Sequence, residues 1–154
     1  YRRLLLMFTP ALLMRIGHAA PTTLYTSECA TVTMDPSTRH VRIVAHAGSS
    51  RAGDCAIDGI MAGVETLLLQ DQTFHVTWDL RASPTPSMIS TAQLAMWGVR
   101  HKAALDKLTI KMGVLVSEGP MVAIIGGVLN IYAGRTPTFV SSVQAHVDAF
   151  VAAE

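Results

Sequence analysis

Histidines and carboxylates are the side chains of this sequence that could bind a metal or move protons, provided that their spacing brings them together. His75 and Asp79 lie four residues apart in the run FHVTWD, so they share one face if that run is a strand. They would then be about 13 Å apart along the strand, which is too far to share one ion. His40 and His46 flank another β-rich run, and neither has a cysteine or a carboxylate at a metal-ligand spacing. The sequence therefore predicts no metal and no cofactor.

Motifs for nucleophilic catalysis and phosphate binding are absent from the sequence. There is no Gly-x-Ser-x-Gly elbow, residues 48–51 lack the Lys-Ser/Thr ending of a phosphate-binding loop, and the glycine pair at 126–127 lies within a predicted helix. His101 stands between Arg100 and Lys102, and we interpret this cluster as a solvated basic patch whose charge could attract an anionic head group. We predict no catalytic residue, and an enzyme is the least supported class of protein.

The composition narrows the class further. The chain has 154 residues, the length of one ordinary domain; half of them are hydrophobic and 15% are charged. Soluble domains carry roughly 25% charged residues, so either the surface is rich in small residues or apolar patches mark contact with a partner. The net charge is +1, and the basic residues are scattered apart from Arg2-Arg3 and residues 100–102, which argues against a nucleic-acid binder.

The two cysteines, Cys29 and Cys55, are too few for a disulfide scaffold and lack the spacing of a metal motif. One interpretation is a single bridge between them. We expect instead two buried, reduced thiols.

The N-terminal segment, residues 1–23, is expected to be an apolar arm that precedes the domain at residues 24–154. Its apolar run from Leu4 to Met14 has 11 residues and contains Pro10, whereas a membrane-spanning helix needs about 20. It is either the remnant of a targeting segment or a retained arm that lies on a membrane surface or in a partner's groove, and we favour the arm. Because the chain begins with Tyr1, we also expect a longer precursor, with an organellar targeting segment removed upstream as one interpretation.

Hydrophobic periodicity and turn residues predict the order β-β-α-β-α-β-α-β-α after a linker at residues 21–26. Strands are expected at residues 28–32, 41–47, 74–80, 110–116 and 138–140, and helices at residues 52–70, 87–108, 120–133 and 143–153. The turn residues at 35–39, DPSTR, favour an antiparallel hairpin between the first two strands. Alternation of strands and helices predicts an α/β domain with a mostly parallel sheet, one antiparallel hairpin strand, and helices packed on the sheet.

The helix predicted at residues 87–108 has an apolar stripe on each of two opposite sides. One stripe is Ala92, Ala95, Met96, Val99 and Ala103, and the other is Leu94, Trp97, Leu105 and Leu108. One of them packs on the sheet, and the other is covered by a neighbouring helix, covered by a partner, or exposed. We expect the surplus face around Trp97 to be a partner contact. In the helix predicted at residues 120–133, Gly126, Asn130 and Gly134 form a smooth ridge that lets another backbone or a flat ligand approach.

The order and spacing of these elements resemble the STAS fold, and more closely the SpoIIAA-like family of small single-domain proteins. The resemblance covers residues 24–154. It is carried by the strand at residues 74–80 with Asp79 near its end, the segment WGVRHK at 97–102, the approach to the next strand at 107–116, the turn at 117–120, and the closing strand and helix at 139–150.

STAS domains that antagonise anti-sigma factors carry a phosphorylatable Ser in an Asp-Ser-Ser-Gly pattern, at the start of the helix after the central strand. The nearest residues here are Ser90 and Thr91, with Ile89 in place of the Asp and Ala92 in place of the Gly. Ser90 and Thr91 are therefore the candidate phospho-acceptors. The family resemblance implies protein contact, or binding of a small molecule or lipid, and no established chemistry.

We therefore expect a non-enzymatic STAS-like interaction module, an accessory or peripheral subunit of a larger, membrane-associated assembly. Two alternatives stay open: a domain that binds or carries a small apolar ligand or lipid, and a phosphoregulated switch. The residues expected to contact the partner are Leu4, Leu5, Phe8, Leu12, Leu94, Trp97, Leu105, Gly126 and Asn130.

Overall fold

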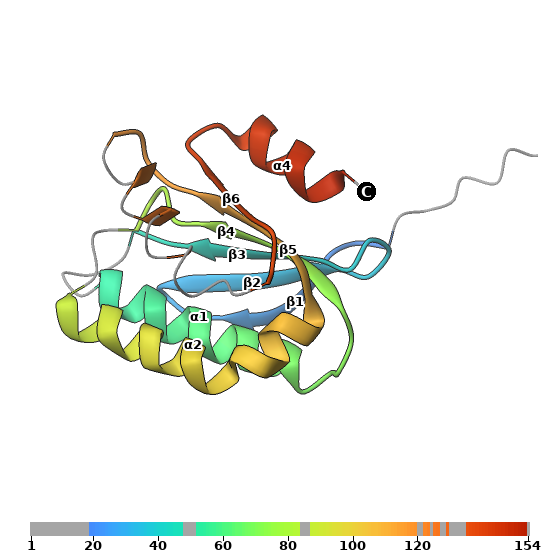
Figure 1. The fold of residues 1–154 in the computed structure, drawn as a ribbon, viewed down its shortest axis with the longest axis horizontal. Coiled ribbons are helices and arrows are strands. Elements are labelled where there is room, and N and C mark those ends of the chain that lie inside the picture. Colours follow the sequence, from blue (N-terminus) through green and yellow to red (C-terminus); the bar gives the residue numbers. More distant parts are fainter. Residues whose placement is uncertain are drawn as a thin grey trace, which may run out of the picture.

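Six strands form one mixed sheet, and they lie in the sheet in the order in which they occur in the chain (Figure 1). The structure is a computed structural model that describes residues 19–47, 52–83, 87–119, 122–123, 125–126, 129 and 135–153. The elements are β1 (Thr22–Thr26), β2 (Ala30–Asp35), β3 (His40–Ala45), α1 (Ala52–Leu68), β4 (Phe74–Asp79), α2 (Met88–Leu108), β5 (Thr109–Leu115), β6 (Thr138–Ser141) and α4 (Gln144–Ala152). The arm residues Leu4, Leu5, Phe8 and Leu12 lie outside the described residues, as does Asn130.

The hairpin between β2 and β3 is confirmed, and its turn is held by the aspartate that opens it. Asp35 Oδ1 accepts hydrogen bonds from the Ser37 hydroxyl at 2.6 Å and the Ser37 amide at 2.8 Å. These bonds favour the charged carboxylate and hold the pKa of Asp35 below its usual value. Arg39 closes the turn with a φ of 53°, a left-handed conformation that is uncommon outside glycine.

Residues 21–26, predicted as a linker, contain a strand instead. β1 pairs antiparallel with β2, with Thr22 opposite Met34 and Thr26 opposite Thr31. The segment TTLYT has the β-branched and aromatic residues of a strand. An edge strand, however, is stabilised by hydrogen bonds to its neighbour, here β2. The sheet is mixed: β1–β2 and β2–β3 are antiparallel pairs, and the parallel pairs are confined to β3 through β6.

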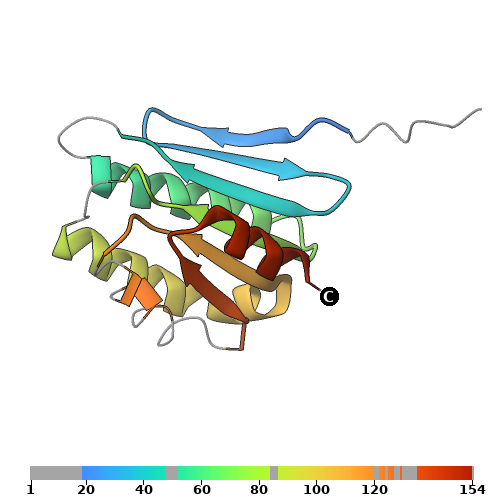
Figure 2. The same cartoon turned by 90° about the horizontal axis from the view of Figure 1, so that it is seen from above.

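The helices lie on both faces of the sheet. Figures 1 and 2 show α1 and α2 side by side on one face and α4 on the other. α1 contacts β1, β2 and β3, whereas α4 contacts β4, β5 and β6. Between β5 and β6, residues 122, 123, 125, 126 and 129 are helical, within the helix predicted at residues 120–133. The α/β architecture expected from the alternation of elements is therefore confirmed.

The main core lies between the sheet and the layer of α1 and α2. Strand side chains alternate between the two faces, so Val41 and Ile43 of β3 and Phe74 and Val76 of β4 enter this core and are almost fully buried. The predicted stripe of α1 is confirmed, since its members are buried in the core or packed against it: Ile57, Ile60, Met61, Val64, Leu67 and Leu68.

A smaller core lies under α4 on the other face, where Val147 and Val151 pack on Leu115. Gly113 of β5 makes this close approach fit. A Cβ atom at that position would lie 2.4 Å from Val147 Cγ1 and 3.0 Å from Val151 Cγ2, which is too close for an unmoved neighbour. The Phe139 and Phe150 rings stack nearby with centroids 5.4 Å apart.

The two cysteines are joined by a disulfide, which corrects the expectation of reduced thiols. Cys29 lies just before β2 and Cys55 lies in the N-terminal part of α1. Packing of α1 on β2 places their Cα atoms 5.6 Å apart, within the range that a disulfide spans. The separation of 26 residues along the chain contains no hint of this proximity.

Candidate functional site

The inner face of α2 is the Trp97 side. Trp97 is 6% exposed and Leu108 is 3% exposed, and Leu94 and Leu105 pack against the main core. The Trp97 indole N–H donates to Glu65 Oε1 of α1 at 2.6 Å, which satisfies the polar atom of the buried ring. These side chains hold α2 to α1 and the sheet, so Trp97 is buried and Leu94 and Leu105 are partly buried within the chain itself.

The outer face of α2 is the surplus face, opposite the one expected. Ile89, Met96 and Val99 are 73%, 57% and 64% exposed, and Met88 in the first turn is 90% exposed. Ala92 and Ala103 continue the same stripe and are exposed as well. The bulkier stripe turns inward because burying Trp and Leu removes more apolar area from water than burying Ala does.

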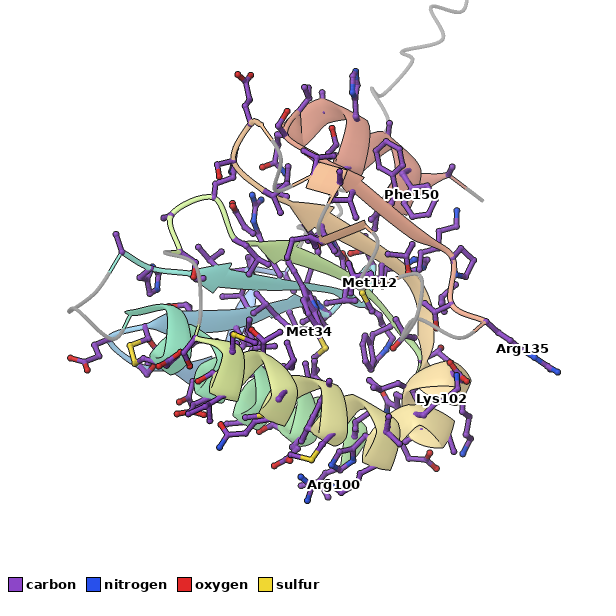
Figure 3. All side chains as sticks on the ribbon, turned by 60° about the vertical axis from the view of Figure 1, so that its left-hand side comes forward. Met34, Arg100, Lys102, Met112, Arg135 and Phe150 are labelled. Atoms are coloured by element: carbon purple, nitrogen blue, oxygen red, sulfur yellow. A yellow bond between two sulfur atoms is a disulfide. The ribbon has the colours of Figure 1, made fainter. Side chains whose placement is uncertain are left out.

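Two shallow depressions lie beside this stripe, one on α2 itself and one between α1 and α2. The depressions, of about 450 and 460 Å³, share Arg100 in their lining. One is lined by Ala95, Met96 and Val99, and the other by Asp58, Glu65 and Gln93 together with Trp97. Figure 3 shows Arg100 at the outer side of α2, away from the sheet. The outer surface of α2 thus combines apolar, basic and acidic side chains.

The first turn of α2 contains the candidate phospho-acceptors. Ser87 is the N-cap, and its hydroxyl accepts from the Ser90 amide at 3.1 Å. The Ser87 amide in turn donates to Asp54 Oδ1 of α1 at 2.8 Å. Ser90 is buried within this arrangement, whereas Thr91 is exposed and its hydroxyl donates to the Ser87 carbonyl. Of the two candidates, only Thr91 is directly accessible to another protein.

A second polar region lies on the opposite face of the sheet, under the end of α4. The parallel register places His40 beside His75, and Thr38, Asp148 and the chain at 151–153 complete a depression of about 450 Å³. Burial lowers the pKa of both imidazoles below 6.5, and the nearby Lys111 ammonium lowers that of His75 further. The lowered pKa of each ring favours its neutral form.

One hydroxyl in this region has the geometry of an activated nucleophile. Thr77 Oγ1 lies 2.8 Å from His40 Nε2, the distance of a nucleophile and its base. Thr77 is fully buried, however, so a substrate cannot reach its hydroxyl. The hydrogen bond between His40 and Thr77 joins β3 to β4.

A network of charged side chains lies next to this region, at the end of β4. The Arg81 guanidinium donates to both oxygens of Asp79, from Nε at 2.8 Å and from Nη2 at 2.6 Å. Arg42 approaches the same carboxylate at 3.5 Å, and Gln144 Oε1 accepts from both guanidinium groups. The hydrogen bonds from Arg81 hold the pKa of Asp79 below its ordinary value. Asp79, one of the residues that carry the family resemblance, thus forms ion pairs with Arg81 and with Arg42 of β3, and both arginines are hydrogen-bonded to Gln144 of α4.

The remaining predicted residues are spread over the molecule. His101 lies 3.6 Å from Glu65 and 4.8 Å from the Trp97 ring, so it joins α2 to α1. A Cβ atom added at Gly126 would have no neighbouring heavy atom within 4 Å. Among the described residues, the one group of three or more metal-ligating side chains that come together is Glu28, Cys29 and Cys55, which the sequence did not reveal.

No protein-family model matches the sequence, and no match is found among curated proteins or among solved structures. Within the part of the chain that the structure describes, no helix has the length and apolar character needed to cross a membrane.

Proposed function

We propose that this chain is a non-enzymatic, STAS-like protein-interaction module whose contact surface is the outer face of α2. The observation that carries the proposal is the exposure of Ile89, Met96 and Val99 on one helix face. Leaving such a stripe in water has no benefit for folding, since the opposite stripe already anchors the helix. An apolar stripe of this kind is typical of a surface that a partner covers.

The spacing of the stripe indicates what kind of partner fits it. Positions 89, 92, 96, 99 and 103 alternate in steps of three and four residues, the seam along which two helices pack. Arg100 flanks the seam, and it forms no ion pair with any described residue. Lys102, on the same helix, pairs with Asp106 at 2.8 Å. The partner element we propose is an amphipathic helix with an apolar stripe and an acidic flank.

The STAS-like, SpoIIAA-like assignment is part of this proposal. It is supported by the alternation of strands and helices and is compatible with the six-stranded α/β architecture. The further proposal of a membrane-associated assembly is supported by the apolar arm in the sequence, Leu4 to Met14, together with the low charge fraction of 15%. In that setting the chain would act as an accessory or peripheral subunit.

The test is purification of the tagged chain from its native source, comparing the wild type with the double variant M96E/V99E. The variant places two carboxylates on the seam and is expected to lose the partner. Its stability should change by no more than about 0.5 kcal/mol, because both side chains are more than half exposed. Leu69→Glu is the matched control, since Leu69 is 87% exposed, lies just after α1 and is not one of the seam positions of α2. Retention of the same partners by M96E/V99E would contradict the proposal.

The membrane part of the proposal has its own test. Deleting residues 1–20 should move the chain from the membrane fraction to the supernatant while the partner contact through α2 persists. An unchanged distribution between the fractions would remove the membrane assignment and leave the α2 surface standing.

A further inference from the structure

The corner where β2 and α1 begin brings three metal-ligating side chains together. One ligand atom each from Glu28, Cys29 and Cys55 lies within 4.8 Å of the others. Cys29 is fully buried, Cys55 is half-buried and Glu28 is exposed. The group therefore extends from the core to the surface, with the carboxylate at the entrance.

We propose that this corner binds one Zn²⁺ ion when the disulfide is reduced, with the Cys29 and Cys55 thiolates and the Glu28 carboxylate as ligands. Two thiolates and one carboxylate suit a borderline-soft divalent ion, and three protein ligands leave a fourth position for water. Metal binding and disulfide formation exclude each other because both use the same sulfur atoms. This site is independent of the α2 surface and of the function proposed for it.

A dithiol can reduce the disulfide and so free the two sulfur ligands. The S–S bond between Cys29 and Cys55 breaks and two thiols form, while the reductant gives up two electrons and two protons and closes to its own disulfide. Zn²⁺ binding then releases the two thiol protons. Cys55 lies at the N-terminal end of α1, where the positive end of the helix dipole favours a thiolate.

Contacts other than the disulfide hold the ligands in place. The Ser27 hydroxyl accepts from the backbone amides of Cys29 at 3.2 Å and Ala30 at 3.1 Å, and the Cys29 carbonyl accepts from the His46 amide at 2.8 Å. These bonds fix the turn that presents Cys29.

The helix is held to the strand by close packing. An added Cβ at Gly59 of α1 would lie 2.7 Å from the Ala30 Cβ, which means that helix and strand are already in contact. The two sulfurs therefore stay neighbours after reduction.

The experiment uses the full chain, reduced with a phosphine in the absence of oxygen. The phosphine becomes a phosphine oxide with its oxygen taken from water, and it leaves both thiols free. We expect one Zn²⁺ per chain by competition with a chromogenic chelator, and none for the oxidised chain. Co²⁺ as the probe should show thiolate-to-metal charge transfer and the visible bands of a tetrahedral site. Zn²⁺ should also protect both cysteines from alkylation, as read by mass spectrometry.

The matched variants decide which residues are ligands. Glu28→Gln should weaken Zn²⁺ binding by at least about tenfold, since loss of even an outer partner of a ligand costs about 10–100-fold. Glu118→Gln, an exposed carboxylate on the loop after β5, should leave the affinity unchanged. Cys55→Ser should abolish binding.

Two outcomes would overturn the proposal. One is a reduced chain that binds no Zn²⁺, or that unfolds and is not refolded by Zn²⁺. The other is equal affinity for the Glu28→Gln and Glu118→Gln chains, which would show that the carboxylate is not a ligand.

Discussion

The two faces of the sheet differ in what their side chains do. Toward α1 and α2 the strands present an apolar layer in which Val41, Ile43 and Phe74 are excluded from water. Toward α4 the same strands present His40, Thr77 and Asp79, which form hydrogen bonds and ion pairs with one another and with neighbouring strands and loops. Among the described helices, α4 is the one that packs on this face, where it contacts β4, β5 and β6.

This difference indicates that the two faces contribute to different properties. The larger apolar core under α1 and α2 stabilises the fold through burial, which is non-directional and grows with area, and the smaller core under α4 adds to it. The polar face supplies directional contacts that respond to pH and to charge. Substitutions at neighbouring positions of one strand should therefore have very different consequences.

Truncation of Phe74 should have the largest effect on stability. Its side chain is 1% exposed, so Phe74→Ala should lower the free energy of unfolding by about 3–5 kcal/mol. His75 is the next residue and points to the other face, and His75→Ala should cost about 1 kcal/mol or less, because its ring is half-buried. Urea unfolding followed by tryptophan fluorescence measures both. Equal losses of unfolding free energy for the two variants would show that burial on the apolar face does not contribute more to stability than the contacts on the polar face.

A methyl group added at Gly113 probes the packing of α4 on the polar face. The new Cβ would meet Val147 and Val151, so Gly113→Ala should destabilise the chain by about 1–3 kcal/mol through overpacking. Gly98 of α2 has nothing within 4 Å of an added Cβ, and Gly98→Ala should stabilise the chain by up to about 1 kcal/mol through helix propensity. The midpoint temperature of thermal unfolding should therefore decrease for Gly113→Ala and increase for Gly98→Ala. A shift in the same direction would contradict the close approach of α4.

Asp79→Asn removes a charge from the polar face and should lower the free energy of unfolding by about 1 kcal/mol. The effect is small because the Arg81 and Arg42 side chains are about 40% exposed, so water screens both ion pairs. The pKa of Asp79 is lowered in the folded chain, so its contribution is present above its ordinary value of 3.8 and is lost as the pH falls below that value. The stability difference between wild type and variant should therefore be measurable at pH 6 and vanish in acid. A difference that stays constant with pH would exclude the ion pair as its cause.

Much of this fold was predictable because its signals are local. The hairpin turn at residues 35–39 and the stripe of α1 depend on neighbouring residues, and both were predicted correctly. β1 was missed because an edge strand depends on pairing with β2, which short-range patterns do not show. The disulfide was missed for the same reason, since packing of α1 brings Cys55 to Cys29.

The candidate sites were less predictable than the elements that position them. Both stripes of α2 were visible, but periodicity alone does not say which one turns inward; the size of Trp97 compared with Ala92 would have been the better guide. The pairing of His40 with His75 depends on the register of two parallel strands, which is a property of the assembled sheet. Spacing within a single strand therefore contains no signal for the proximity of His40 and His75.

The smallest effect expected is the pH dependence that His40 and His75 give to stability. Burial is the main cause of the lowered pKa of each ring, so the unfolded chain binds protons at a higher pH than the folded chain does. Stability from this source is complete above 6.5 and decreases as the pH falls through 6.5 toward the folded pKa.

Urea unfolding at pH 7.5, 6.5 and 5.5 should show this loss, and the double variant H40Q/H75Q should reduce the slope in this range. Ring titration by NMR in the folded wild type provides the direct check, with both midpoints below 6.5. A midpoint above 6.5 for His40 would mean that the ring is stabilised in its charged form. The carboxylate of Asp148 would then outweigh burial, and the polar face would gain stability in acid instead of losing it.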